Sequence, residues 1–282
     1  MRHIFTKTLL AIFLLSTYSP NSISAAENSD SIKVELILRK AHELPKDSSK
    51  TLYFANQFLG VSYVGGTLEE SKQEQLLIDL KRLDCTTFVE NIIALVQTER
   101  QGDLSFPAFK KMLQKVRYRH GEINGYTSRL HYMTDWIADN QEKGLIKERI
   151  LKPYSKPQTL YLNFMSTHPE SYWQIKNSKE NQESIRQQEK KWQGVVVSYV
   201  DKEYLKLPST KLQIKNGDML ALVTTIKGLD VVHVGFAQWI GEKLHLLHAS
   251  SAHKKVILDP MPLYNYMKTK KSQLGVRVIA TE

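Results

Sequence analysis

The sequence predicts an α+β fold in which helices come first and a mainly antiparallel sheet follows. Apolar side chains recur at helical spacing over residues 32–59 and again after Cys85. From Gly194 onward, short β-branched runs are separated by Gly, Asn, Asp and Lys. A set of helices followed by a set of strands is typical of the α+β class.

The N-terminal part contains the helices. The pattern over residues 32–59 breaks near Pro45, so we expect two helices there. The pair Gly65-Gly66 marks a turn. Asp84 occupies the place of an N-cap, and the helix that follows it presents one apolar face, made of Phe88, Val89, Ile92, Ile93 and Val96.

Residues 100–193 are expected to be mostly helical or irregular and to form an insertion between that helix and the sheet. The polar stretch from Glu170 to Lys191 is typical of a solvated helix face. The strands expected after the insertion are "GVVVSYV", "DMLALVTTI", "VVHVGFAQWI", "KLHLLHAS", "KVILD" and "GVRVIA".

The first 26 residues have the pattern of a secretory signal peptide. Arg2 and Lys7 form a basic start, Leu9–Leu15 is apolar, and small residues surround Ala25 and Ala26. The apolar stretch is too short for a stable bilayer anchor, although an N-terminal anchor is the alternative interpretation. We therefore expect an exported protein, periplasmic or secreted, without stable membrane insertion.

The chain is basic, with a formal net charge of +10. A basic exported protein often meets an anionic surface, such as bacterial cell wall or lipid. Nucleic acid is the other common partner of basic chains. No nucleic-acid-binding motif stands out in this sequence, and export argues against such a partner.

Cys85 is the only cysteine in the chain. An odd cysteine in an exported protein indicates a free reactive thiol or an intermolecular bridge, whereas a buried one serves as a small apolar side chain. The first turn of a helix favours a nucleophile, because its unpaired N–H groups and dipole lower a thiol pKa. The same turn offers the N–H of Cys85 as an oxyanion donor.

A cysteine nucleophile needs a base, usually a histidine that a third polar group orients. His233 and His248 lie in strand-like runs, and adjacent strands would place His233 beside the thiol with His248 behind it. A core role for His233 is one alternative. A metal site that includes His245 and His253 is another, but His245 and His248 point to opposite faces of a strand. We expect no metal.

The series "SYVGGT … LDCTTFVE … NGDMLALV … VVHVGFA … LLHASS" resembles the NlpC-type cell-wall hydrolases, which are papain-like cysteine peptidases and amidases of bacteria. The resemblance implies a papain-like core with Cys85 as nucleophile and His233 as base. It also implies that His248 orients the base and that Tyr63 is the active-site tyrosine. Thr86-Thr87 stands where the common pattern has Ser-Gly, which indicates a divergent branch.

The segment "TSRLHYMTDWI" is similar to the N-acetylmuramoyl-L-alanine amidase-like branch. That similarity implies cleavage between the lactyl group of muramic acid and L-alanine, notably in anhydro-muropeptides, without a metal or organic cofactor. We expect residues 27–282 to form one domain and the protein to be a monomer. A D-glutamyl-diamino acid endopeptidase, a non-catalytic wall-binding module, and a thiol acyltransferase or general protease are the alternatives.

Ser128, Arg129 and Asp84 are the candidate substrate-binding residues. A guanidinium binds carboxylates through two parallel hydrogen bonds, so Arg129 suits a carboxylate of the stem peptide. Trp136 and Tyr132 suit stacking on a sugar. The apolar stripe that contains Trp136 also fits a core-facing helix, and we expect Trp136 in the core. Tyr126 and His131 are left without a role.

Overall fold

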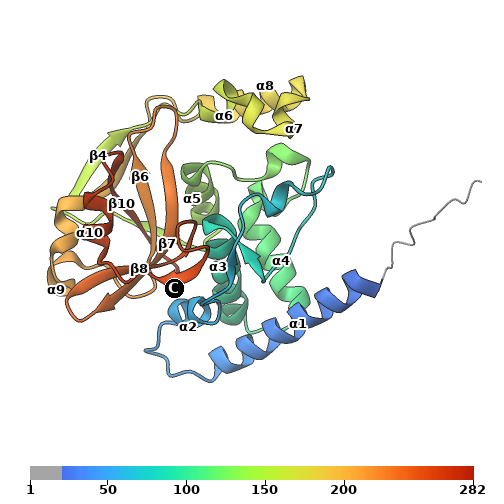
Figure 1. Ribbon diagram of the computed structural model, residues 1–282, viewed down its shortest axis with the longest axis horizontal. Helices are drawn as coiled ribbons and strands as arrows, with labels where there is room; N and C mark the ends of the chain where they lie inside the picture. Colours follow the sequence, from blue (N-terminus) through green and yellow to red (C-terminus); the bar gives the residue numbers. More distant parts are fainter. Residues whose placement is uncertain (1–20) are drawn as a thin grey trace, which may run out of the picture.

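The computed structural model describes residues 21–282. The predicted signal peptide lies largely outside this range, and its last residues fall at the start of helix α1 (Asn21–His42). The α+β class is confirmed: helices cover both faces of a mixed sheet (Figure 1). Within residues 21–282, no helix is both long and apolar enough to cross a bilayer.

Ten strands of the described chain form one sheet in the order β2-β1-β9-β8-β7-β6-β10-β5-β4, with β3 paired to β10. All pairs are antiparallel except β1 with β2. The strands are β1 (Ser62–Tyr63), β2 (Arg82–Leu83), β3 (Lys147–Arg149), β4 (Ser155–Thr159), β5 (Val196–Asp201), β6 (Met219–Thr224), β7 (Val231–Ile240), β8 (Lys243–Ser250), β9 (Lys255–Leu258) and β10 (Gln273–Ala280).

The predicted strands from Gly194 onward are thus all present, and the sheet is mainly antiparallel as expected. Helices α1 and α2 (Lys50–Asn56) lie on either side of the predicted break at Pro45. The remaining helices are α3 (Cys85–Gln101), α4 (Phe106–Arg117), α5 (Met133–Glu142), α6 (Phe164–Thr167), α7 (Trp173–Lys176), α8 (Lys179–Lys190), α9 (Ser209–Leu212) and α10 (Leu263–Lys268).

Successive side chains of a strand point to opposite faces of the sheet, so the strands contribute to two cores, one on each face. Val234 and Phe236 of β7 join the larger core, which α1 to α5 cover. Ala237 of β7 joins the second core, which α9 and α10 cover on the opposite face. Figure 1 shows α3 standing beside β7, and the two elements are in contact. The helix that begins with Cys85 therefore packs on the strand that carries His233.

The segment 100–193 is helical for the most part, but it is not separate from the sheet. It contributes β3 and β4, which pair with β10 and β5. Its short helices α6, α7 and α8 enclose a small core of their own, with Ile175 and Ile185 fully buried. In α8 only Ile185 and Glu189 are buried, and the rest of the helix is exposed or half-buried, as the polar composition predicts.

Candidate active site

The first turn of α3 presents Cys85 through a closed capping arrangement. The carboxylate of Asp84 accepts from the N–H of Thr87 at 2.8 Å, and the hydroxyl of Thr87 accepts from the N–H of Asp84 at 2.9 Å. This reciprocal cap confirms Asp84 as the N-cap and fixes where the helix begins. Because Thr87 is the second half of that cap, the "TT" in place of "SG" has a structural use.

The thiol of Cys85 lies against β7 at the position next to His233. The backbone of Val234, the residue after His233, hydrogen-bonds the thiol, and Cys85 is half-buried. Tyr63 at the end of β1 lies close enough to Cys85 for the thiolate charge to raise the pKa of its hydroxyl, although burial is the larger cause. The fold thus brings Cys85 beside Tyr63 and against the strand that carries His233.

His233 and His248 share a short hydrogen bond between β7 and β8. Nε2 of His233 lies 2.5 Å from Nδ1 of His248, and the ring planes are nearly perpendicular. His233 is half-buried, whereas His248 is fully enclosed. Since Nε2 of His233 is engaged by His248, Nδ1 is the nitrogen that remains for the thiol.

Gly235 allows the two strands to approach at this point. A Cβ atom on Gly235 would lie 2.8 Å from the carbonyl oxygen of Leu247 and 2.9 Å from Cβ of His248, distances that real Cβ contacts do not reach. The glycine in "HVG" therefore makes room for the backbone that carries His248.

The electrostatics of the site correct one expectation. Burial, followed by the charge of Asp84, raises the pKa of the Cys85 thiol to about 11, so the prediction of a lowered thiol pKa is wrong for the free protein. Burial, followed by the charges of His248 and Lys270, lowers the pKa of His233 to about 3. At neutral pH the resting pair is a neutral thiol and a neutral imidazole.

Residues 53–276 match the N-acetylmuramoyl-L-alanine amidase-like family. The chain belongs to this family. It is similar to an N-acetylmuramoyl-L-alanine amidase from Bacteroides uniformis, with 39% identity over 83% of this chain and 98% of the other, at a TM-score of 0.78. No curated protein matches it.

Two further structures resemble this amidase-like protein. A Bacteroides fragilis protein described as a candidate xylanase is 42% identical over 83% of this chain and 100% of its own, with a TM-score of 0.76. A Legionella pneumophila protein of the DUF1460 family is 22% identical over 91% and 96%, with a TM-score of 0.66, and shares the fold.

Three residues beside the histidine pair escaped the sequence analysis. Asp259, directly after β9, lies 3.4 Å from Nε2 of His248. The ring of Tyr266 in α10 stands edge-on to His248 at 6.0 Å, and Lys270 places its Nζ over that ring at 4.6 Å. The sequence offered one signal for Asp259: it is the acidic residue at the end of "KVILD", directly after the strand that pairs with the His248 strand.

The candidate substrate-binding residues all have partners within the chain. The carboxylate of Asp84 is engaged by the helix cap. Ser128 closes its own turn, donating to the carbonyl of Gly125 at 2.7 Å and accepting from the N–H of Asn124 at 2.9 Å. Their predicted contacts with substrate stay predictions, because these bonds are made without one.

Arg129 is buried in an ion-pair network with the segment that follows Tyr63. Its guanidinium contacts Glu74 at 2.6 Å and Glu69 at 2.5 Å, and it donates to the carbonyl of Leu68 at 3.2 Å. The ring of Tyr126 packs beneath the guanidinium at 5.2 Å. These contacts give Arg129 a structural role in holding residues 68–74, and its predicted contact with a substrate carboxylate stays untested.

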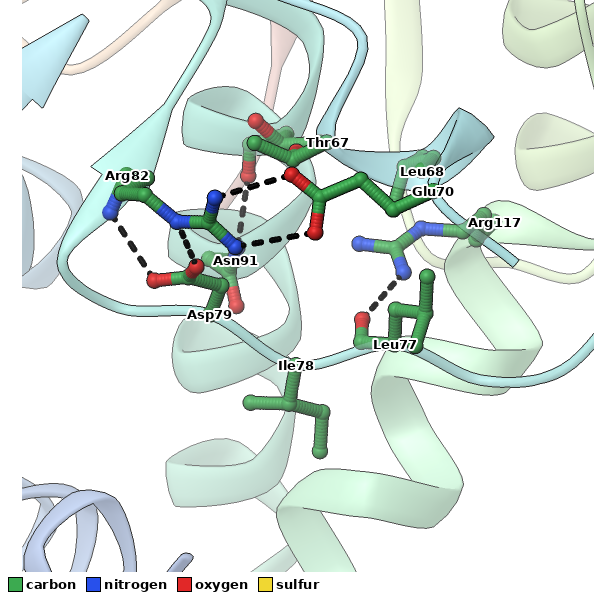
Figure 2. Close-up of a pocket in the computed structure, with 10 residues that line it drawn as sticks. Thr67, Leu68, Glu70, Leu77, Ile78, Asp79, Arg82, Asn91 and Arg117 are labelled. Carbon is green, nitrogen blue, oxygen red and sulfur yellow. Dashed lines mark hydrogen bonds and ion pairs between the residues drawn. The ribbon is translucent and has the colours of Figure 1, made fainter. Parts of the chain in front are cut away.

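The same segment encloses a cavity of about 100 Å³ beside α3. Figure 2 shows Arg82 at this cavity between the carboxylates of Glu70 and Asp79, and Arg117 donating to the carbonyl of Leu77. Cys85, Tyr63 and the two histidines do not line it. The cavity is therefore distinct from the thiol–imidazole cluster.

The other expectations for this region concern aromatic and histidine side chains. Trp136 is fully buried in the larger core, as predicted. His131 donates from Nε2 to the carbonyl of Tyr126 at 3.0 Å, and its ring packs at a tilt against the ring of Tyr126. His245 donates Nδ1–H to the carbonyl of Asp259, on the strand face opposite His248. Within residues 21–282 no group of three or more His, Cys, Asp or Glu side chains is arranged to hold a metal ion.

Proposed function

We propose that this protein is a cell-wall amidase that uses Cys85 as nucleophile and His233 as base. The finer proposal is an N-acetylmuramoyl-L-alanine amidase that releases the stem peptide from muropeptides, including anhydro forms. The observation that carries it is the cluster itself: a thiol at a helix start, against the strand position next to an imidazole that a second imidazole holds. Membership of the amidase-like family supports the reaction class.

The proposed reaction begins from the neutral pair. As Sγ of Cys85 attacks the amide carbonyl, its proton passes to Nδ1 of His233. The N–H of Cys85 and the hydroxyl of Tyr63 hold the oxyanion. The imidazolium returns the proton to the leaving amine, which leaves a thioester. Water, deprotonated by His233, hydrolyses that thioester and restores the thiol.

The charges around the site suit an acidic substrate. Lys270 acts on both imidazoles, lowering the pKa of each, and its Nζ lies over Tyr266 at the edge of the cluster. The chain as a whole carries a formal charge of +10. A stem peptide carries free carboxylates, so both features favour it as a substrate over a neutral glycan.

Export to the periplasm or beyond the cell, a monomeric state and a role in cell-wall recycling are parts of the same proposal. The leader pattern supports export.

The decisive experiment is a mass-spectrometric digest. The mature protein and its Cys85→Ala variant are each incubated with reducing and anhydro muropeptides. Release of a stem peptide that begins with L-alanine, absent with the variant, is the expected result. His233→Ala should abolish turnover as well, and full activity of that variant would refute the assigned base.

Other products decide between the alternatives. Fragments cut after D-glutamate would indicate an endopeptidase that uses the same residues. A product that carries an added amine would indicate acyl transfer. Binding of muropeptides without any cleavage would indicate a wall-binding module.

A further inference from the structure

We propose that Asp259 is a positioning residue, which acts through His248 to leave Nδ1 of His233 free to accept the proton of the thiol. No motif in the sequence singled out this residue. The inference rests on the proposed function for its link to catalysis, although the arrangement of protons can be measured without a substrate.

The contacts of Asp259 divide cleanly between the fold and the site. Its backbone serves the fold, because the N–H donates to the carbonyl of Leu246 at 2.8 Å and the carbonyl accepts from His245 at 2.9 Å. Oδ1 accepts from the N–H of Met261 at 2.9 Å. Oδ2 is left to face Nε2 of His248 at 3.4 Å.

Nε2 of His248 faces this carboxylate and has no other acceptor nearby in the described chain. The nitrogen is buried and makes no hydrogen bond within residues 21–282, and Oδ2 of Asp259, at 3.4 Å, is the charged atom that it meets. Asp259 itself is 5% exposed, so solvent does not readily take its place. A carboxylate only accepts hydrogen bonds, and it therefore favours the form of His248 that carries its proton on Nε2.

The tautomer of His248 in turn sets the tautomer of His233. With its proton on Nε2, His248 presents a lone pair on Nδ1, and this lone pair accepts from Nε2–H of His233 across 2.5 Å. His233 then has no proton on Nδ1. A free Nδ1 is what the thiol of Cys85 needs, since the base must accept a proton during attack.

The carboxylate also stabilises the charged stage of the reaction. When His233 becomes an imidazolium, the negative charge of Asp259 lies behind neutral His248. The other titratable groups beside this pair are Lys270 and His253, which lower the pKa of His248, and Tyr266 from α10. Asp84 lies on the opposite side, at the thiol.

Asp259→Asn is the informative variant because it keeps the shape and the Oδ1 acceptor. An amide nitrogen in place of Oδ2 would donate to Nε2 of His248 and move the proton of that ring to Nδ1. Two N–H groups would then face each other between His248 and His233, so His233 would move its proton to Nδ1. That nitrogen would no longer accept from Cys85.

The primary measurement is ¹⁵N NMR of the histidine rings near neutral pH. In the wild-type protein His248 should carry its proton on Nε2 and His233 on Nε2, and in Asp259→Asn both should carry it on Nδ1. Turnover of muropeptide should fall on the order of 10⁴-fold in kcat, with KM little changed, as for the equivalent change in a serine-protease triad.

His245→Gln is the matched control, since it loosens the backbone of Asp259 without altering the carboxylate. It should leave the ring protons and kcat near wild type. Equal losses in both variants, or unchanged ring protons in Asp259→Asn, would overturn the proposal. Should Asp259→Asn not fold, the wild-type spectrum decides: a proton on Nδ1 of His248 refutes the proposal. Absence of muropeptide cleavage by a wild-type protein with the expected ring protons would refute the proposed function alone.

Discussion

His233 and His248 meet at 84°, edge to face, and share a 2.5 Å hydrogen bond between neighbouring strands. A base held by one nitrogen in this way keeps its ring plane and offers the other nitrogen in a fixed direction. The pair joins the β7 and β8 strands at the point where α3 begins its first turn. The chemistry therefore depends on how closely the strands approach, as well as on which residues they carry.

The thiol of Cys85 should alkylate slowly at neutral pH. Because burial and Asp84 raise its pKa to about 11, the thiolate is scarce at pH 7 and increases about tenfold per pH unit up to pH 10. Rates with iodoacetamide between pH 5 and 10.5 test this, with N-acetylcysteine as the unperturbed thiol. A plateau already reached below pH 7 would indicate a preformed thiolate–imidazolium pair.

Gly235→Ala should impair turnover more than stability. The added Cβ displaces the backbone of Leu247 and His248, which costs about 1–3 kcal/mol of unfolding free energy and moves the orienting imidazole. Gly102→Ala at the C-cap of α3 is the control, since it strains a positive φ in open space at about 1 kcal/mol. Urea melts and kcat on muropeptide separate the two effects; equal kcat in both variants would contradict the expectation.

Arg129→Met should destabilise the protein strongly. It leaves the carboxylate of Glu74, 6% exposed, with the hydroxyl of Tyr118 but without its cation, and loss of one member of a buried ion pair costs about 3–5 kcal/mol. Urea melts measure this, and Arg129→Lys, which keeps the charge, should lose less. A normal melt with a raised KM would instead support the substrate-binding role predicted from sequence.

Acid should destabilise the protein below about pH 6.5. Burial lowers the pKa of His131 and of His233 to about 3, so the unfolded chain binds more protons than the folded one between pH 6.5 and 3. The stability from keeping these rings neutral is complete above pH 6.5 and falls with pH, by up to about 1.4 kcal/mol per unit for each ring. His131→Gln should reduce the slope of the free energy of unfolding against pH by the contribution of one histidine, as measured by urea melts at pH 4 to 7. An unchanged slope would contradict this expectation.

Lys270→Met should shift the pH dependence of turnover. Burial, and to a smaller extent Lys270, lower the pKa of His233 and of His248. Removal of Lys270 should therefore raise these pKa values and shift the acidic limb of the kcat–pH profile to higher pH. If the cation also attracts the stem peptide, KM should increase several-fold, and that increase should disappear at high salt. Lys268→Met, on the neighbouring ring of Tyr264, is the control.

Sequence patterns found the helices, the strands and the two histidines because each depends on local spacing. The cap on α3 and the buried face of that helix were visible in the same way. Asp259 was not, because its role arises from the pairing of β8 with β9 and from a single oxygen atom left without a backbone partner. Arg129 could be recognised as a carboxylate binder, but sequence spacing does not reveal that Glu69 and Glu74 supply the carboxylates.

The thiol shows a different limit of sequence reasoning. Its place at a helix start was correct, and the expected drop in pKa was not, because burial against β7 outweighs the favourable field of the first turn. Desolvation depends on everything packed around a group, and no local pattern reports it.

The last strand of the chain, β10, lies in the middle of the sheet between β6 and β5, although it contributes none of the proposed site residues. A polypeptide that stops short of Gln273 therefore contains Cys85, both histidines and Asp259, yet exposes a bare edge on β6, the immediate neighbour of the His233 strand. Premature termination between Asp259 and Gln273 should therefore yield a chain that has every proposed reacting group and no activity. The proposed site therefore forms only after the ribosome has completed β10.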